Sequence, residues 1–447
     1  MKVKDIKDWE KLTPEQKREH RLKRWLDAPG AKFSSPEAEK LYKERVTRLM
    51  KALLVEEPDR VPVILPSANY PAYHIGKTLH DVMYDYDDLQ EAWSAFLRDF
   101  EMDTFRGPAL VYPAKMMEKV DYRLYKWPGH GLSENVTTYQ FVEGEYMKAD
   151  EYDLLLRDAS DFALRTFLPR AAGALEPLVR LNRFASILGT PIRFINPAAN
   201  PGVREALKAV IEAGEEMEKW QKAVRICNRE AVAAGVPLMG GGMGMAPFDT
   251  IGDSLRGTQG VIMDMYRRPD KLHEAMDMLA DIMISSAVEV ADASGGIIVN
   301  FPLHKGDDTF MSDKQFEEFY WPSLKKVILG LIDEGLMVEL FAEGRYERRL
   351  DAISELPKGW TMWQFDQTDM ANVKRVIGKV CCIAGNVPSS IISTGTPQQV
   401  KESCRRLIEI CAPGGGYMLT GGAAVSETSA ENLRAFTEAA KEYGVYK

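Results

Sequence analysis

Charged side chains follow an apolar run at residues 337–349, which read MVELFAEGRYERR. The apolar part has the length of a buried parallel strand, and Glu343 and Arg345 stand where that strand should end. A carboxylate at such a position can serve as a base, a metal ligand or a recognition group. The arginine can hold an anion through two parallel hydrogen bonds. A structural ion pair between Glu343 and Arg345 is the alternative interpretation.

His304 follows a second apolar run, GIIVNFPL at 296–303, and is neighboured by Lys305, Asp307 and Asp308. A neutral imidazole at a strand end can accept a proton or ligate a metal ion. The alternative is a loop histidine that is hydrogen-bonded to a backbone carbonyl. The sequence alone leaves these two interpretations of His304 open.

The elements that must position these residues alternate regularly along the chain. Apolar runs of strand length occur at 60–66, 103–110, 236–242, 296–303, 337–344, 360–366, 379–388 and 416–424. Helical patterns separate nearly all of them, which predicts the α/β class with a parallel sheet. Eight such repeats favour a closed (β/α)8 TIM barrel, and a doubly wound open sheet is the competing topology.

Two segments lie outside this alternation. Residues 1–58 are polar and helical in pattern, and we expect an N-terminal helical extension that caps the barrel; binding a sister subunit is the alternative. Residues 59–447 are expected to form the barrel. Within them, about 111–160 contain alternating aromatic runs such as VDYRLYKW, which predict a small antiparallel excursion from the main sheet.

In a barrel of this kind the functional site lies at the carboxyl ends of the strands. The side chains that the pattern brings to those ends form the candidate site. We predict catalytic roles for His304, Glu343 and Asp366, and substrate binding by Asn69, Tyr70, Arg106, Met243, Asp307, Asp308, Arg345, Gln367 and Asn386. Asp369 and Thr396 are better explained as N-caps of the helices that follow them.

Composition excludes several classes of function. The chain has 447 residues and a net charge of -9, which gives a nucleic-acid partner no electrostatic support. No apolar run reaches the roughly 20 residues that span a bilayer, so we expect no membrane association. The five cysteines are an odd number without framework spacing, which is typical of reduced thiols in a cytoplasmic protein.

Three segments carry a family resemblance: RVPV at 60–63, GNVPSSIISTGTPQQVKE at 385–402 and GGGYMLTGGAAVSETSAENLRAF at 414–436. They resemble the uroporphyrinogen decarboxylase (URO-D) superfamily over about residues 45–447. The resemblance implies a (β/α)8 barrel with its site at the mouth and, in many members, a homodimer. The superfamily includes the porphyrinogen decarboxylases and corrinoid-linked methyltransferases, some of which use zinc to activate a thiol.

The chain departs from both subtypes. Porphyrinogen decarboxylases open with an arginine-rich RQAGRY-type segment, whereas SANYPAYHIG at 67–76 contains no arginine. The thiol-activating methyltransferases carry a His-x-Cys pair and a later cysteine, where this chain has Phe341, Glu343 and the Gly421–Gly422 pair. These losses argue against a thiol-activating zinc site. An oxygen-rich metal site that uses Glu343 and His304 stays open.

The resemblance and these departures favour a methyltransferase that moves a methyl group from a small methylated substrate to a corrinoid on a separate protein. The chain has no Asp-x-His-x-x-Gly cobalamin-binding motif, so the corrinoid is expected on a partner protein. One alternative is a decarboxylase of uroporphyrinogen or another carboxylated substrate, with Asp366 or Asp308 delivering a proton. Another is a barrel that binds a ligand without chemistry.

Overall fold

One parallel sheet forms the centre of the protein. The computed structural model describes residue 6 and residues 8–446. Within these residues the sheet has six strands in chain order: β4 (Gly240–Met243), β5 (Ile298–Leu303), β6 (Met337–Ala342), β7 (Thr361–Phe365), β8 (Cys382–Ala384) and β9 (Tyr417–Met418). Every neighbouring pair is parallel. The predicted α/β class is confirmed.

Two further segments connect the edges of this sheet. They are the stretches 61–65 and 103–105, both predicted as strands. Three backbone hydrogen bonds make the connection: Ile64 N to Leu419 O (3.0 Å), Asp103 N to Val63 O (3.2 Å) and Phe105 N to Pro237 O (3.0 Å). Pairing therefore passes from β9 through both segments to the residues that lead into β4, as the predicted barrel requires.

Both connecting segments are shorter than the sequence predicted. Pro62 and Pro66 have no N–H to donate, so the first segment makes only isolated bridges instead of a regular ladder. The second segment ends early because Pro108 begins a 3-10 turn (Pro108–Leu110).

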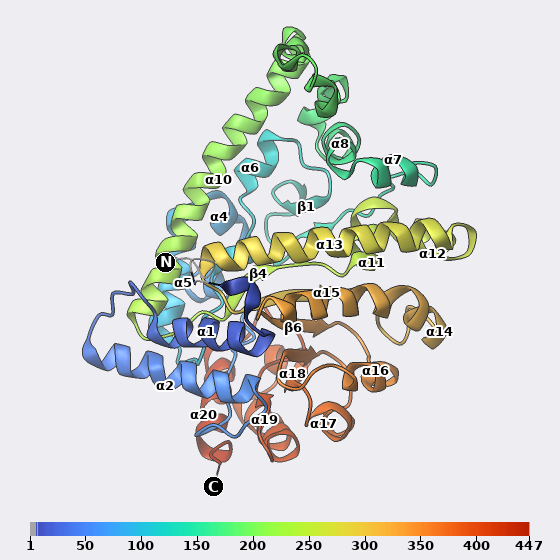
Figure 1. Cartoon of the computed structure of the whole chain (residues 1–447). Helices are drawn as coiled ribbons and strands as arrows, with labels where there is room; N and C mark the ends of the chain where they lie inside the picture. The colour runs from blue at the N-terminus through green and yellow to red at the C-terminus, as the bar shows by residue number, and fades with distance from the viewer. Residues whose placement is uncertain (1–5, 7, 447) are drawn as a thin grey trace.

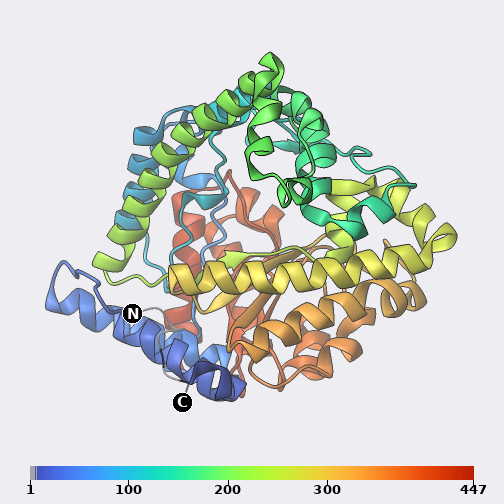
Figure 2. The ribbon, with the colours of Figure 1, turned by 45° about the horizontal axis from the view of Figure 1, so that its top comes forward.

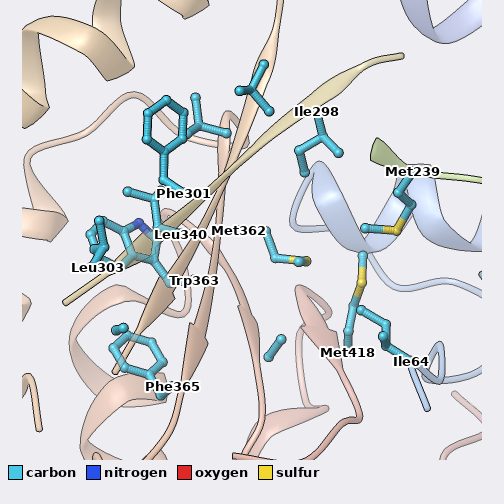
Figure 3. Packing of buried hydrophobic residues seen from close by; sticks show 14 of the residues in the cluster. Ile64, Met239, Ile298, Phe301, Leu303, Leu340, Met362, Trp363, Phe365 and Met418 are labelled. Carbon is cyan, nitrogen blue, oxygen red and sulfur yellow. The ribbon is translucent and has the colours of Figure 1, made fainter. Parts of the chain in front are cut away.

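The sheet has two apolar faces, which Figure 3 shows from close by. Phe301, Leu340 and Trp363 are register neighbours on one face, at most 1% exposed. The opposite face lines the inside of the barrel. There the buried side chains of Ile64, Met239, Ile298, Met362 and Met418 meet near the ends where the strands begin. This apolar layer forms the floor of the barrel.

Helices surround the sheet, largely where the pattern predicted them (Figure 1). They include α5 (Tyr86–Asp99), α10 (Pro201–Ala233), α12 (Gly257–Arg267), α13 (Pro269–Ser294), α15 (Trp321–Asp333), α16 (Leu350–Ser354), α17 (Met370–Ile377), α19 (Pro397–Cys411) and α20 (Ala430–Tyr443). The helical pattern between the apolar runs 236–242 and 296–303 contains two long helices, α12 and α13, because Pro269 starts a new one. Asp369 and Thr396 are N-caps, as predicted.

The N-terminal helices α1 (Pro14–Asp27) and α2 (Pro36–Leu53) lie across the end of the barrel where the strands begin (Figure 1). Trp25 donates its indole N–H to the carbonyl of Leu238 (2.9 Å), just before β4. Arg18 donates to the carbonyl of Gly359 (2.8 Å), just before β7. These contacts hold the helical extension against the floor, so the opposite end is the mouth.

The antiparallel excursion lies over the mouth. Its strand β1 (Tyr125–Pro128) pairs antiparallel with β3 (Gln140–Phe141) and parallel with β2 (Gly131–Leu132). The carbonyl of Thr137 accepts from Asn69 Nδ2 (3.2 Å) and Ser426 Oγ (3.4 Å), which belong to the loops after the first and last barrel strands. Beside it, short helices and turns lead into the 33-residue helix α10, which rises from the barrel (Figure 2).

Asp103 supports the junction between the two connecting segments. Its carboxylate is fully buried and accepts from Arg48 (2.7 Å), Arg60 (2.7 Å) and the backbone N–H of Val63 (2.8 Å). Arg48 belongs to α2, so the same carboxylate also attaches the N-terminal extension.

We expect Asp103→Ala to lower the free energy of unfolding by about 3 kcal/mol, because it leaves the largely buried guanidinium of Arg60 without its carboxylate and that of Arg48 with Asp59 alone. Chemical denaturation followed by circular dichroism measures the change. Glu101→Ala is the control: it removes an exposed ion pair with Lys441 and should cost less than about 1 kcal/mol. Equal losses in the two variants would contradict this account of the junction.

Candidate functional site at the barrel mouth

Asp249 fixes the backbone of the loop that carries His304. Its carboxylate is completely buried after β4 and accepts from the backbone N–H groups of His304 (3.0 Å) and Lys305 (3.1 Å). The hydroxyl of Tyr320 also donates to Asp249 (2.8 Å). Three donors therefore hold one carboxylate, and the end of β5 cannot move independently of the end of β4.

Asp253 holds the side chains that follow. It lies on a π-helical turn (Thr250–Leu255) and contacts His304 Nδ1 (2.6 Å) and Lys305 Nζ (2.7 Å). Burial raises the pKa of Asp253, but the hydrogen bonds from His304 and Lys305 outweigh it, and the pKa is lowered overall. Asp253 is therefore an ionised acceptor, and Nδ1 of His304 must donate to it. This leaves Nε2 directed at Glu343, 3.9 Å away.

The same contacts keep His304 protonated. Burial lowers the pKa of the imidazole, but the hydrogen bond to Asp253 and the charges of Asp249, Asp253 and Glu343 raise it to about 9. Burial and the neighbouring Asp253 raise the pKa of Asp249 to about 6. At neutral pH the site therefore presents an imidazolium N–H, at Nε2, to the mouth.

Glu343 and Asp366 complete the group of predicted catalytic side chains. Glu343 follows β6. Burial and the charge of Asp366 raise the pKa of its carboxyl, and the charge of His304 only partly offsets this rise. Asp366 follows β7 and accepts from the backbone N–H of Gly344 (3.3 Å) and from Gln367 Nε2 (3.2 Å). The fold thus brings His304, Glu343 and Asp366 together from three adjacent strand ends.

Several predicted binding residues have structural partners. Asn386 donates to the carbonyls of Asp366 (3.2 Å) and Thr368 (2.8 Å), which links the ends of β7 and β8. Asn69 holds the excursion, as described above. Tyr70 is buried, with its hydroxyl 3.3 Å from Nδ1 of His74. The contacts of these side chains position the loops of the mouth.

The remaining candidates lie at the rim. Asp307 Oδ1 accepts from the backbone N–H groups of Thr309 (2.6 Å) and Phe310 (2.7 Å) and so caps its own turn. Asp308 accepts from the backbone N–H of Arg348 (3.2 Å), and burial raises its pKa.

Arg345 and Met243 are exposed side chains at the rim, and Met243 ends β4. Among the described residues, no ion pair joins Arg345 to Glu343. The structural ion pair considered from the sequence is therefore not formed; Glu343 faces His304 instead.

The sequence reasoning missed Asp249, Asp253 and Tyr320. The two aspartates are four residues apart and follow the glycine-rich strand GGGMGM by one turn, which is a signal that could have been read. Tyr320 lies within a helical pattern, and nothing in its local sequence distinguishes it from a core aromatic residue.

The described side chains provide few metal ligands at this site. In the described part of the chain, no group of three or more His, Cys, Asp or Glu side chains is arranged to hold a metal ion. Asp253 engages Nδ1 of His304, and the remaining donors, Nε2 and the carboxylates of Glu343 and Asp366, are not arranged around one point. A catalytic zinc ion usually takes three protein ligands, so the described residues do not fit one, and we derive no step through a metal.

Comparison with known proteins identifies the family. The family model for uroporphyrinogen decarboxylase (URO-D) matches residues 186–443, more than half of the chain. The chain belongs to the URO-D family.

The relatives found by sequence are uroporphyrinogen decarboxylases, whereas a protein of similar structure is a methyltransferase. The chain is 22% identical to the uroporphyrinogen decarboxylase of Actinobacillus succinogenes, over 56% of this chain and 71% of the relative. It is 24% identical to that of Actinobacillus pleuropneumoniae serotype 5b, with the same coverage. A methyltransferase from Methanosarcina mazei has a similar structure, with a TM-score of 0.59 and 17% identity over 90% of this chain and 98% of the other. This last likeness concerns the fold alone.

Within the described residues, no helix is both long and apolar enough to cross a membrane.

We expect Asp253→Asn to lower the pKa of His304 from about 9, because it removes the charge-assisted hydrogen bond while burial still disfavours the imidazolium. NMR titration of the imidazole Cε1–H resonance measures this, with His304→Gln used to assign the peak. Asp277→Asn, at an exposed ion pair with Lys326, is the matched control and should leave the titration unchanged. An unchanged His304 pKa in Asp253→Asn would contradict the assigned hydrogen bond.

Proposed function

We propose that this URO-D family protein is a methyltransferase that takes a methyl group from a small methylated compound and passes it to a corrinoid carried by a separate protein. The arrangement that supports the proposal is an imidazolium held by Asp253, with Nε2–H directed into the mouth beside Glu343. A methyl group bound to oxygen, nitrogen or sulfur leaves only if the heteroatom keeps the bonding electron pair. Protonating that heteroatom makes it a better leaving group.

The residues have defined tasks in this reaction. Nε2 of His304 donates its proton to the heteroatom as the carbon–heteroatom bond breaks. Asp253 keeps Nδ1 protonated and the ring oriented, so Nε2 is the nitrogen that gives up the proton. Glu343 faces the same nitrogen from 3.9 Å, and its charge helps to keep the imidazole protonated. The corrinoid, when its carrier protein is bound, supplies the nucleophile that accepts the methyl group.

Decarboxylation is the second candidate, because the relatives named above are uroporphyrinogen decarboxylases. Its substrate carries many carboxylates and needs several cations to hold them. The segment after the first barrel strand, SANYPAYHIG, has no arginine. Arg106 contacts Glu339 through Nη2 and Arg345 lies exposed at the rim, so these two side chains do not form an array of cations. The described mouth therefore favours a substrate with little negative charge over a polycarboxylate.

A methyl-transfer assay tests the proposal. Purified protein is incubated with chemically reduced cobalamin and, one at a time, methyl ethers, methylamines and methyl thioethers, and methylated cobalamin is measured by chromatography. We expect transfer from at least one class, and a fall of about 100-fold or more in His304→Gln, because a general acid contributes about that factor. If no donor reacts, and uroporphyrinogen III is converted to coproporphyrinogen, the proposal is wrong and the decarboxylase takes its place.

The pH dependence of kcat/KM gives a separate prediction. Because the pKa of His304 is raised to about 9, the acid is present below that pH, and activity should fall as the pH rises through it. Asp253→Asn should move this fall to lower pH, because the charge that raised the pKa is gone. Asp277→Asn should not move it. An Asp253→Asn profile that is merely scaled down, with the same midpoint, would assign Asp253 a structural role only.

A further inference from the structure

The inner face of the barrel changes character between its floor and its mouth. Ile298 and Met337 are register partners near the floor, and one layer higher the partners are Asn300 and Glu339. The next inward position on β6 is Phe341, which pairs with Gln364 of β7. Asn300 and Glu339 thus form a polar layer on β5 and β6, below the group of His304, Glu343 and Asp366, whereas Met362 keeps β7 apolar at the level of Glu339.

Arg106 joins this polar layer from across the barrel. It follows the connecting segment 103–105, and its Nη2 donates to Glu339 Oε1. Glu339 is buried, with 6% of its side chain exposed, whereas 46% of the Arg106 side chain is exposed. A buried carboxylate on the inner face thus holds a guanidinium that solvent still reaches.

The exposure of the neighbouring side chains shows from which direction solvent reaches Arg106. Asn300 and Phe341 are partly exposed, while Phe301 and Leu340, which alternate with them and face outward, are 0% exposed. Helices cover the outer face, so inward-facing side chains can be reached only through the mouth. Solvent therefore reaches Asn300, Phe341 and Arg106 from the inside of the barrel.

Arg106 has donors to spare. A guanidinium carries five N–H groups. Within the described residues, the one side-chain partner of Arg106 is Glu339, and only Nη2 is used. A solvent-accessible cation with free N–H groups is suited to an anionic group such as a carboxylate.

The distance between Arg106 and the catalytic group limits the shape of the ligand. Glu339 lies on β6 and Glu343 directly follows it, four residues later, which corresponds to roughly 13 Å if the chain keeps the rise of a parallel strand. The side chains shorten this span, and the ring of Phe341 lies between the two levels. A ligand that reaches both ends has its two functional groups at opposite ends of an extended, flat, apolar spacer.

We propose that Arg106, positioned by Glu339, binds a single anionic group of the substrate at the end opposite to the transferred methyl group. The substrate class is thus a methylated monocarboxylate with a rigid apolar spacer, and this inference rests on the proposed function for the role of the methyl end. One cation in the interior accommodates one anion, which agrees with the lack of an arginine array. Arg345 at the rim is the competing anchor.

A binding experiment tests this without any methyl transfer. The probes are 4-methoxybenzoate and its neutral analogue 4-methoxybenzamide, titrated into the protein by calorimetry in the absence of corrinoid. We expect the carboxylate to bind about tenfold more tightly or better, and this preference to disappear in Arg106→Gln. Arg345→Gln is the matched control and should keep it. Equal affinities for the two probes, or a preference lost only in Arg345→Gln, overturns the inference.

A second pair of variants separates anion binding from a structural role. In Glu339→Gln the guanidinium keeps its hydrogen-bond partner but loses the opposing charge, so the benzoate should bind several-fold more tightly while the benzamide is unaffected. Arg106→Lys keeps the charge without the planar fork and should retain part of the preference. If Glu339→Gln instead weakens both probes alike, the pair is only structural and the inference is wrong.

The outcomes separate this inference from the proposed function. If the preference for the carboxylate probe depends on Arg106 but no donor transfers its methyl group, the anion site is supported and the methyltransferase proposal is wrong. If neutral donors transfer their methyl group as well as anionic donors do, the methyltransferase proposal is supported and the inference of an anion site is wrong.

Discussion

Asp103 and Val63 meet where the two irregular segments of the barrel lie side by side. The backbone N–H of Asp103 donates to the carbonyl of Val63, and its carboxylate accepts from the N–H of Val63. Parallel strands expose unpaired backbone groups at both edges of an open sheet, which is costly unless something covers or pairs them. Here the pairing of Asp103 with Val63 carries the ladder between β9 and the residues before β4. It also brings Arg106, three residues later, into the barrel.

Buried carboxylates recur as the means by which separate strand ends are held together. Asp103 joins the first two segments to α2, Asp249 joins the ends of β4 and β5, and Glu339 holds Arg106 from the far side. Asp103 and Asp249 satisfy backbone donors that would otherwise be buried without partners, and the guanidinium of Arg106 compensates the buried charge of Glu339. These contacts hold the strand ends in place at the mouth. The polar atoms that the carboxylates do not engage are the ones available to a substrate.

The free atoms define a functional axis along the barrel. At the upper end is Nε2 of His304, protonated at neutral pH because Asp253 occupies Nδ1. At the lower end are the unused N–H groups of Arg106, and Phe341 lies between. The excursion that carries Thr137 lies above both. The acid at the upper end accounts for the proposed chemistry, and the anion anchor at the lower end accounts for the proposed substrate shape.

Much of the fold and part of the candidate site could be predicted from the sequence, because these features depend on local patterns along the chain. Six of the eight apolar runs are strands, and the strand ends supplied His304, Glu343 and Asp366, because the position of a residue after a parallel strand fixes the end of the barrel at which it lies. Asp369 and Thr396 were recognisable as caps from their immediate neighbours alone. What the sequence could not supply were the partners: Asp253 for His304 and Glu339 for Arg106, which are 51 and 233 residues away. Hydrogen bonds over such separations depend on the closure of the sheet and on side-chain rotamers. The tertiary structure alone therefore decided the protonation of His304, the pairing of Arg106 and the failure of Glu343 to pair with Arg345.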